Sequence, residues 1–208
     1  MIAGLRPAGG ILIRAVIASA ALTAFAAASG TGAPGERPVA YHRISMGEYQ
    51  NFLANWDEHK QPVLYALADS PAHYAALFHP APVTFGSRHF APELAFYASE
   101  EILVVGRVIP SPPAGSKVFD VESLTEDGHD LTLRYRFHDS GSKASFTIKD
   151  YLALRIPKHG YRKIVFIENG KRIGELSPAE GVWSVPGIAA DAAPPAPVPM
   201  PDGHDVST

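Results

Sequence analysis

Histidine is the residue type that most suggests chemistry in this sequence. Metal sites need two or more ligands that converge on one ion, most securely at i,i+4 on a helix or i,i+2 on a strand. Five histidines fall in the first half of the chain, and no two of them have that spacing: His42, His59, His73, His79 and His89. We therefore expect surface histidines and no bound metal, and we keep an enzyme built on these histidines as the alternative.

Motifs for acyl transfer and phosphate binding are weak. A hydrolase nucleophile needs Gly-x-Ser-x-Gly directly after a strand, and Gly86-Ser87-Arg88-His89 lacks that pattern. The Ser-x-x-Lys of residues 140–143 is typical of a solvated hairpin loop. Neighbouring carboxylates on a strand point to opposite faces and cannot share a proton, as in Glu100-Glu101 and Glu126-Asp127. Because Gly-x-Gly-x-x-Gly is also missing, the motifs predict no catalytic residue and no cofactor.

Basic and aromatic side chains gather in residues 149–163, against an acidic background. This composition is enriched in protein interfaces. An equally good explanation is that the charges solvate an edge strand and discourage edge pairing. The residues predicted to form an exposed interaction surface are Tyr151, Arg155, Lys158, Tyr161 and Arg162.

Residues 1–28 have the three parts of a signal peptide. The only charges before Glu36 are two arginines, and an alanine-rich apolar stretch follows them. It ends in Ala26-Ala27-Ala28, small residues that signal peptidase accepts, so we expect the mature chain to begin near Ser29. The alternative is an uncleaved membrane anchor, since residues 11–28 approach the length of about 17–25 apolar residues that a membrane span needs. The expected location is the periplasm or the outside of a bacterial cell.

The charge balance and the lack of cysteine limit the classes of partner. Without cysteine the chain can form no disulfide, no sulfur-based zinc site and no lipoprotein anchor. The whole chain has 18 basic and 21 acidic residues, and loss of residues 1–28 would leave a formal charge near −5, from 16 and 21. Such a surface gives no reason to expect nucleic acid or membrane as a partner. Another envelope protein is the expected partner.

Composition divides the mature chain into three parts. Residues 29–37 are rich in glycine and predict a flexible entry segment. Residues 38–186 suit one β-rich domain. Residues 187–208 are rich in proline and alanine, cannot bury enough apolar surface to offset their ordering entropy, and are predicted to be disordered.

Period-two alternation predicts strands in the second half of the domain. Leu131, Leu133, Tyr135 and Phe137 share one face, as expected for a strand with one wet side. Residues 101–109 form a continuous apolar run, which is typical of a strand covered on both faces. Further strands are predicted at 117–124, 146–156 and 164–168. In the second of these, the residues at even positions are apolar except Asp150.

Turn and cap signals complete the predicted fold. Asn169-Gly170 and Glu126-Asp127-Gly128 each separate two strands and predict hairpin turns. Residues 46–56 have apolar side chains at helical spacing, and Ser70-Pro71 opens a second short helix. The fold class is therefore mainly β (α+β): an antiparallel β-sandwich or open barrel with two short N-terminal helices.

The strand order over residues 101–167 resembles that of the exported PrcB-type domain. The resemblance rests on Glu-Ile-Leu-Val-Val-Gly-Arg-Val-Ile, Phe-Asp-Val-Glu-Ser-Leu and Tyr-Leu-Ala-Leu-Arg-Ile-Pro-Lys, and it covers about a third of the chain. The family's Thr-Gly-Gly-Tyr turn is replaced here by residues 110–115. The resemblance implies a small β module that accompanies a protease and has no catalytic residues of its own. The leading hypothesis is a non-enzymatic extracytoplasmic binding or interaction module, and the alternative is a periplasmic hydrolase or metal-dependent enzyme.

Overall fold

The computed structural model describes residues 35–45, 48, 51–80, 91–139 and 141–181. The expected signal peptide (1–28) and tail (187–208) lie outside these ranges and stay predictions. Within the described ranges, no helix is long and apolar enough to cross a membrane.

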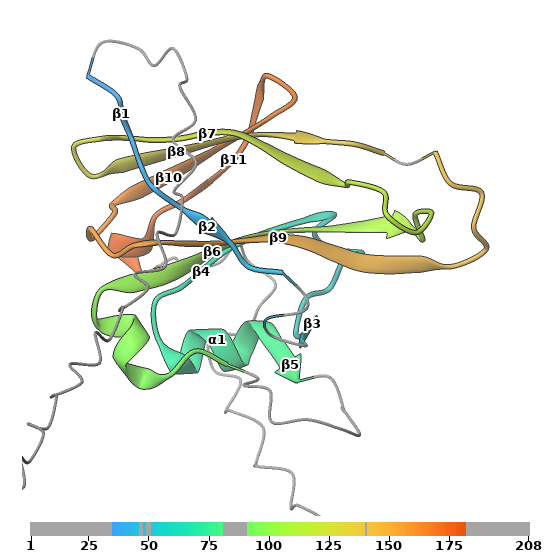
Figure 1. The fold of residues 1–208 in the computed structure, drawn as a ribbon, viewed down its shortest axis with the longest axis horizontal. Helices are drawn as coiled ribbons and strands as arrows, with labels where there is room; N and C mark the ends of the chain where they lie inside the picture. The colour runs from blue at the N-terminus through green and yellow to red at the C-terminus, as the bar shows by residue number, and fades with distance from the viewer. Residues whose placement is uncertain (1–34, 46–47, 49–50, 81–90, 140, 182–208) are drawn as a thin grey trace, which may run out of the picture.

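Two β-sheets face each other and form a sandwich (Figure 1). The first sheet has the order β1-β7-β8-β10-β11 and the second has the order β2-β9-β6-β4. The strands of the first sheet are β1 (Arg37–Pro38), β7 (Phe119–Asp127), β8 (Asp130–Phe137), β10 (Lys163–Glu168) and β11 (Lys171–Leu176). Those of the second are β2 (His42–Arg43), β9 (Thr147–Pro157), β6 (Glu100–Pro110) and β4 (Val63–Ala68). The prediction of a mainly β, sandwich-like fold is confirmed.

A smaller third layer covers the outer face of the second sheet (Figure 1). It contains α1 (Pro71–Leu77), the strand pair β3 (Asn51–Leu53) and β5 (Phe78–Pro80), and the 3₁₀ helix η1 (Leu94–Ala98). A second 3₁₀ helix, η2 (Pro178–Glu180), follows β11. The second sheet therefore lies between two hydrophobic cores.

This position explains the continuous apolar run of β6. Leu103 and Val105 belong to the core between the sheets, whereas Ile102 and Val104 belong to the core under the third layer. Because successive side chains of a strand point to opposite faces, a strand covered twice has no place for an alternating polar residue. The prediction for residues 101–109 is confirmed.

Only one of the two predicted helices forms among the described residues. Ser70 caps α1, its Oγ accepts a hydrogen bond from His73 N at 3.2 Å, and Pro71 follows as predicted. The helix predicted for residues 46–56 is wrong where it is described, because residues 51–53 form β3. Pairing with β5 stabilises this strand, and short helices depend on such tertiary contacts. The predicted Ser45–Glu48 cap contact forms only a local turn, with 2.9 Å from Ser45 N to Glu48 Oε1.

One strand pair departs from the predicted antiparallel order. β10 runs parallel to β8, whereas all other neighbouring strands that are described pair antiparallel. Between β8 and β10 the chain crosses to the second sheet, forms β9 there and returns. This return brings β10 beside β8 in the same direction.

The two long sides of the sandwich are closed differently. On one side β11 approaches β4 so closely that a Cβ at Gly174 would lie 2.4 Å from the Tyr65 ring. On the other side residues 37–45, which we call the strap, pass from the first sheet to the second (Figure 1). The strap pairs with only two residues of β9, Leu154 and Arg155, and then Ile44 N donates to Ala153 O at 2.9 Å.

The turn between β10 and β11 has the predicted conformation. Asn169 and Gly170 have φ of 49° and 78°, the two positive values that a type I′ turn requires. The Asn169 side chain also binds the end of β8: its Oδ1 accepts from Phe137 N at 3.1 Å and its Nδ2 donates to Phe137 O at 3.2 Å.

Gly170→Val should lower the free energy of unfolding by about 1–3 kcal/mol, because a β-branched residue is strained at positive φ. A Cβ at Gly170 meets no atom within 4 Å, so the loss reports backbone strain. Denaturant melts measure it, and Lys171→Val is the control, since it places valine on the next, exposed strand residue. Equal midpoints for the two variants would show that the turn is not tight.

Candidate functional site

A cleft opens where the strap leaves β9, and we call it the β9 cleft. Its volume is about 440 Å³, within the range of about 300–1,000 Å³ that is usual for small-molecule sites. Three segments line it: the end of the strap, the loop before β7, and the middle of β9. The lining residues are Arg43, Ile44, Ser45, Gly115, Ser116, Lys117, Val118, Asp150 and Tyr151.

Asp150 is the half-buried acid of the β9 cleft. Its Oδ1 accepts a hydrogen bond from Tyr151 N at 2.8 Å. Burial raises the pKa of the Asp150 carboxyl, and the Tyr151 hydrogen bond and the charge of Arg43 only partly oppose this. The carboxylate therefore lies in a partly desolvated place where a cationic group would stabilise it.

Arg43 supplies the positive charge that acts on Asp150 in the cleft. Its Nη1 donates to Phe119 O, on β7, at 2.8 Å, which ties the strap to the first sheet. Among the described residues, no ion pair of 4.0 Å or less joins Arg43 to Asp150. The cleft thus presents opposite charges that influence each other without touching.

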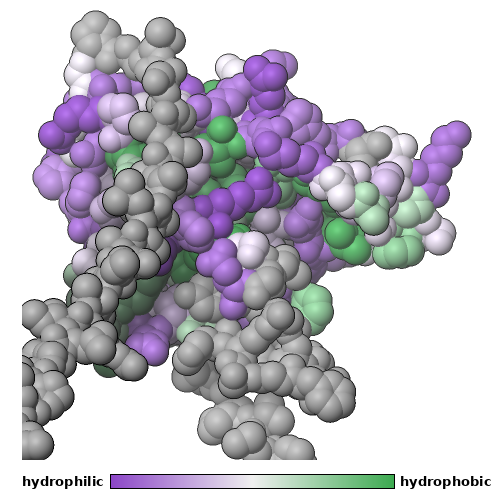
Figure 2. All heavy atoms as spheres, viewed as in Figure 1, coloured by the Kyte–Doolittle hydropathy of each residue, from purple (hydrophilic) through white to green (hydrophobic). Residues whose placement is uncertain are grey.

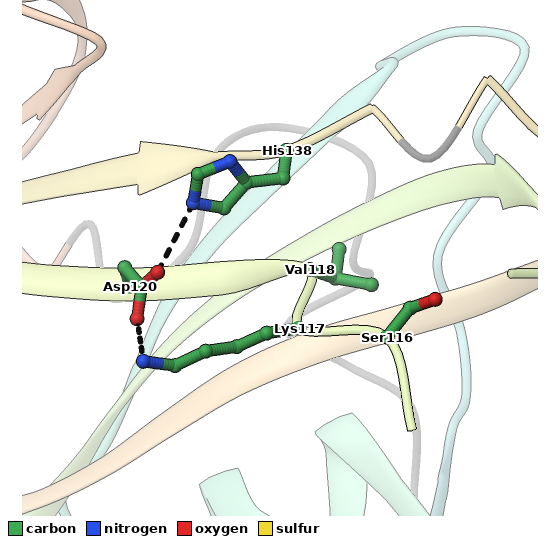
Figure 3. Close-up of a pocket in the computed structure, with 5 residues that line it drawn as sticks. All are labelled: Ser116, Lys117, Val118, Asp120 and His138. Atoms are coloured by element: carbon green, nitrogen blue, oxygen red, sulfur yellow. Dashed lines mark hydrogen bonds and ion pairs between the residues drawn. The ribbon is translucent and has the colours of Figure 1, made fainter. Parts of the chain in front are cut away.

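A second cleft, which we call the loop cleft, shares Ser116, Lys117 and Val118 with the first (Figure 3). Its volume is about 400 Å³, and Asp120 and His138 complete its lining. Asp120 forms ion pairs with Lys117 and with His138, the latter at 3.1 Å between Oδ2 and Nε2. The hydrogen bond from Lys117, helped by the one from His138, lowers the pKa of the Asp120 carboxyl.

The loop cleft contains the residue types of a serine hydrolase but not the contacts. A nucleophile and its base must lie within hydrogen-bond reach, about 2.6–3.2 Å. In Figure 3 the two contacts drawn both end on Asp120, and none joins Ser116 to His138. The imidazole is therefore held by an acid but has no described serine to activate.

The five residues predicted to form an interaction surface do not gather in one place. Tyr161 is 3% exposed and lies in the core between the sheets, so the prediction that it is exposed is wrong. The physical reason is the crossing back to the first sheet after β9, where Arg162 N already donates to His129 O at 2.9 Å. That return turns the Tyr161 ring inward.

The other four residues are divided between two parts of β9 and its following turn. Tyr151 lines the β9 cleft, roughly 13 Å along the strand from Arg155. Arg155 donates to Glu100 at 2.7 Å, and Lys158 Nζ donates to the carbonyls of Asp69 and Tyr97 at 2.9 and 3.3 Å. Arg162 is exposed. Of the predicted set, only Tyr151 belongs to a described cleft.

Lys158 lies near a buried acid, Glu101, at the start of β6. Glu101 is 3% exposed, and burial raises its pKa to about 7; Lys158 opposes the shift and Asp69 adds to it. Burial also raises the pKa of the Tyr161 hydroxyl, with Glu126 and Glu101 as further causes. Lys158, Glu101 and Tyr161 lie at this end of the sandwich, and none of them lines the β9 cleft or the loop cleft.

A further polar group lies between the sheets at the other end of β6. Arg107 of β6 forms an ion pair with Glu168 of β10, and the Tyr135 hydroxyl donates to Glu168 Oε2 at 2.9 Å. The Arg107 guanidinium also lies over the Phe137 ring, 4.9 Å from its centre. Burial raises the pKa of Tyr135, and that of the nearby Tyr65 to about 12. This ion pair joins β6 of the second sheet to β10 of the first, so we interpret the group as a structural link between the sheets.

Two of the described histidines in the first half of the chain pair with acidic residues, and each has an acid of its own. His42 pairs with Glu48 at 3.1 Å, His73 pairs with Asp69, and His79 lies in β5. His89 lies outside the described residues. In the part of the chain that the structure describes, no three residues of the types His, Cys, Asp and Glu are placed to hold a metal ion.

Sequence reasoning missed most of the residues that line the two clefts. Arg43, Lys117, Asp120 and His138 come from three separate segments, and no motif links them. Asp150 did carry a signal, since it breaks the core-facing parity of its strand. A polar residue at such a position indicates that the core opens there.

The two clefts can bind polar and charged groups, but their described contacts do not assemble a nucleophile with a base. Binding loops on a rigid β scaffold commonly have this form. Comparison of the chain with family models, curated proteins and solved structures gives no match to any of them.

Proposed function

We propose that the protein is a non-enzymatic binding module that is exported from the cytoplasm and that takes a small polar ligand into the β9 cleft. The observation that carries the proposal is the lining of this cleft, which combines a half-buried acid with two basic side chains and two serines. Convergent polar groups around a cleft of this volume are typical of small-molecule sites.

Two further features support a binding role. The hydrophilic residues in Figure 2 cover most of the described part of that face, and hydrophobic residues show only in patches between them. Monomeric proteins that bind through a broad apolar surface expose a larger continuous patch. The resemblance to exported PrcB-type domains also favours a module without catalytic residues.

A protein-observed NMR screen of the exported chain with a library of small polar fragments tests the proposal. We expect shift changes at the amides of residues 43–45, 115–118 and 150–151. Ser116→Trp should abolish them by filling the cleft, whereas Ser145→Trp, on an exposed loop residue outside the lining, should leave them unchanged. Shift changes confined to another face, or none with any fragment, would contradict the proposal.

A further inference from the structure

We propose that the ligand of the β9 cleft is a free dipeptide whose ammonium group binds Asp150 and whose carboxylate binds Arg43. This inference rests on the proposed function and adds the ligand class. It follows from three features of the cleft: an acid with no described cation within ion-pair distance, a guanidinium with spare donors, and an exposed edge of β9.

Asp150 accounts for the ammonium group. The carboxylate is half-buried and its only described hydrogen bond comes from a backbone N–H. Arg43 acts on it through its charge, but no described cation lies within ion-pair distance of it. A desolvated carboxylate is stabilised by a charge-assisted hydrogen bond from an ammonium group. The negative charge of Asp150 would repel the carboxylate of the ligand from this position.

Arg43 accounts for the carboxylate. One of its terminal nitrogens donates to Phe119 O, and the described contacts leave its Nη2 and Nε without an acceptor. A guanidinium offers its donors in a planar fork that matches a carboxylate. Lys117 is less suited, because it already forms an ion pair with Asp120.

The edge of β9 accounts for the peptide between the two charges. Ala153 O points to the strap side, where it accepts from Ile44 N. Backbone groups of alternate residues point to the same edge, so the Tyr151 carbonyl also faces the cleft, while the Tyr151 N–H is held by Asp150. The amide N–H of an extended peptide can donate to that carbonyl. Two extended residues span roughly 7 Å, which lets one ligand reach two charges that do not touch each other.

Isothermal titration of the full exported chain with three probes tests the inference. The probes are L-alanyl-L-alanine, its N-acetyl derivative, which lacks the ammonium group, and its C-terminal amide, which lacks the carboxylate. We expect the unmodified dipeptide to bind at least tenfold more tightly than either derivative. Equal affinity for all three, or no binding of the unmodified dipeptide, would overturn the inference.

Two variants assign the charges to their residues. Asp150→Asn should remove the preference for the dipeptide over its N-acetyl derivative, and Arg43→Gln, which keeps a donor for Phe119 O, should remove the preference over the amide. Asp139→Asn and Arg162→Gln, both exposed and outside the cleft, are the matched controls and should change neither preference. A variant that keeps the preference assigned to it would overturn that assignment, and thermal melts verify that each variant is folded.

The two proposals fail in different ways. If polar fragments shift the cleft amides but the dipeptide shows no dependence on its charged ends, the binding module stands and the ligand class is wrong. If no fragment and no probe perturbs the cleft, both are wrong.

Discussion

Glu168→Ala should lower the free energy of unfolding by about 3–5 kcal/mol, because it leaves the charge of the largely buried Arg107 side chain without its partner. Glu168 is 9% exposed, pairs with Arg107 of the opposite sheet and accepts the Tyr135 hydroxyl hydrogen bond. The substitution removes the ion pair and the acceptor together. Urea denaturation at neutral pH measures the loss.

The first control is a surface pair of the same residue types. Arg136 and Glu122 form an ion pair at 2.6 Å, and both are exposed, so Glu122→Ala should cost less than about 1 kcal/mol. The second control is the double variant Arg107→Met/Glu168→Met, which removes both charges and should recover most of the loss. A loss for Glu168→Ala as small as that for Glu122→Ala would show that the pair is solvated rather than buried.

The alternation of β8 predicted that Tyr135 faces the core, but it did not predict what the hydroxyl binds. A period-two pattern gives the face of each residue and says nothing of which strand lies opposite. Arg107 lies in the apolar run of β6, and Glu168 was only the last residue of a predicted strand. Their pairing depends on how the two sheets are placed, which the local pattern does not contain.

The same limit applies to the fold. The strands of the second half and the Asn169-Gly170 turn could be predicted because each depends on neighbouring residues. The β3 segment could not, since its apolar spacing suits a helix and only β5, which follows α1, selects the strand. The parallel pairing of β10 with β8 depends on β9 crossing to the other sheet.

Only part of the candidate site could be predicted from the sequence. Tyr151 was found because basic and aromatic residues are dense in its segment. Arg43 and Lys117 were missed, because they meet β9 only through the strap and the loop before β7. A site assembled from three segments has no motif of its own, and Asp150 marks it only by breaking an alternation.

The stability of the domain should fall as pH rises from about 5 to 8, and Glu101→Gln should remove this dependence. The pKa of Glu101 is raised from its ordinary value of 4.5 to about 7 in the folded protein, mainly by burial. The folded state therefore holds this proton more firmly than the unfolded state does. The stability that the protonated carboxyl contributes is fully present below pH 4.5 and is lost as the pH passes about 7.

Glutamine keeps the shape of the protonated acid and carries no charge at any pH. Glu101→Gln should match the wild type near pH 4.5 and be more stable by about 3 kcal/mol at pH 8, at ~1.4 kcal/mol per pH unit. Lys158 and Asp69, which face Glu101 with opposite charges, are the same in both proteins. Denaturant melts at several pH values compare the variant with wild type and with Glu100→Gln, whose carboxylate is paired with Arg155 and which should gain nothing at pH 8. A difference between Glu101→Gln and wild type that stays constant from pH 5 to 8 would show that Glu101 titrates as an ordinary, solvated carboxyl.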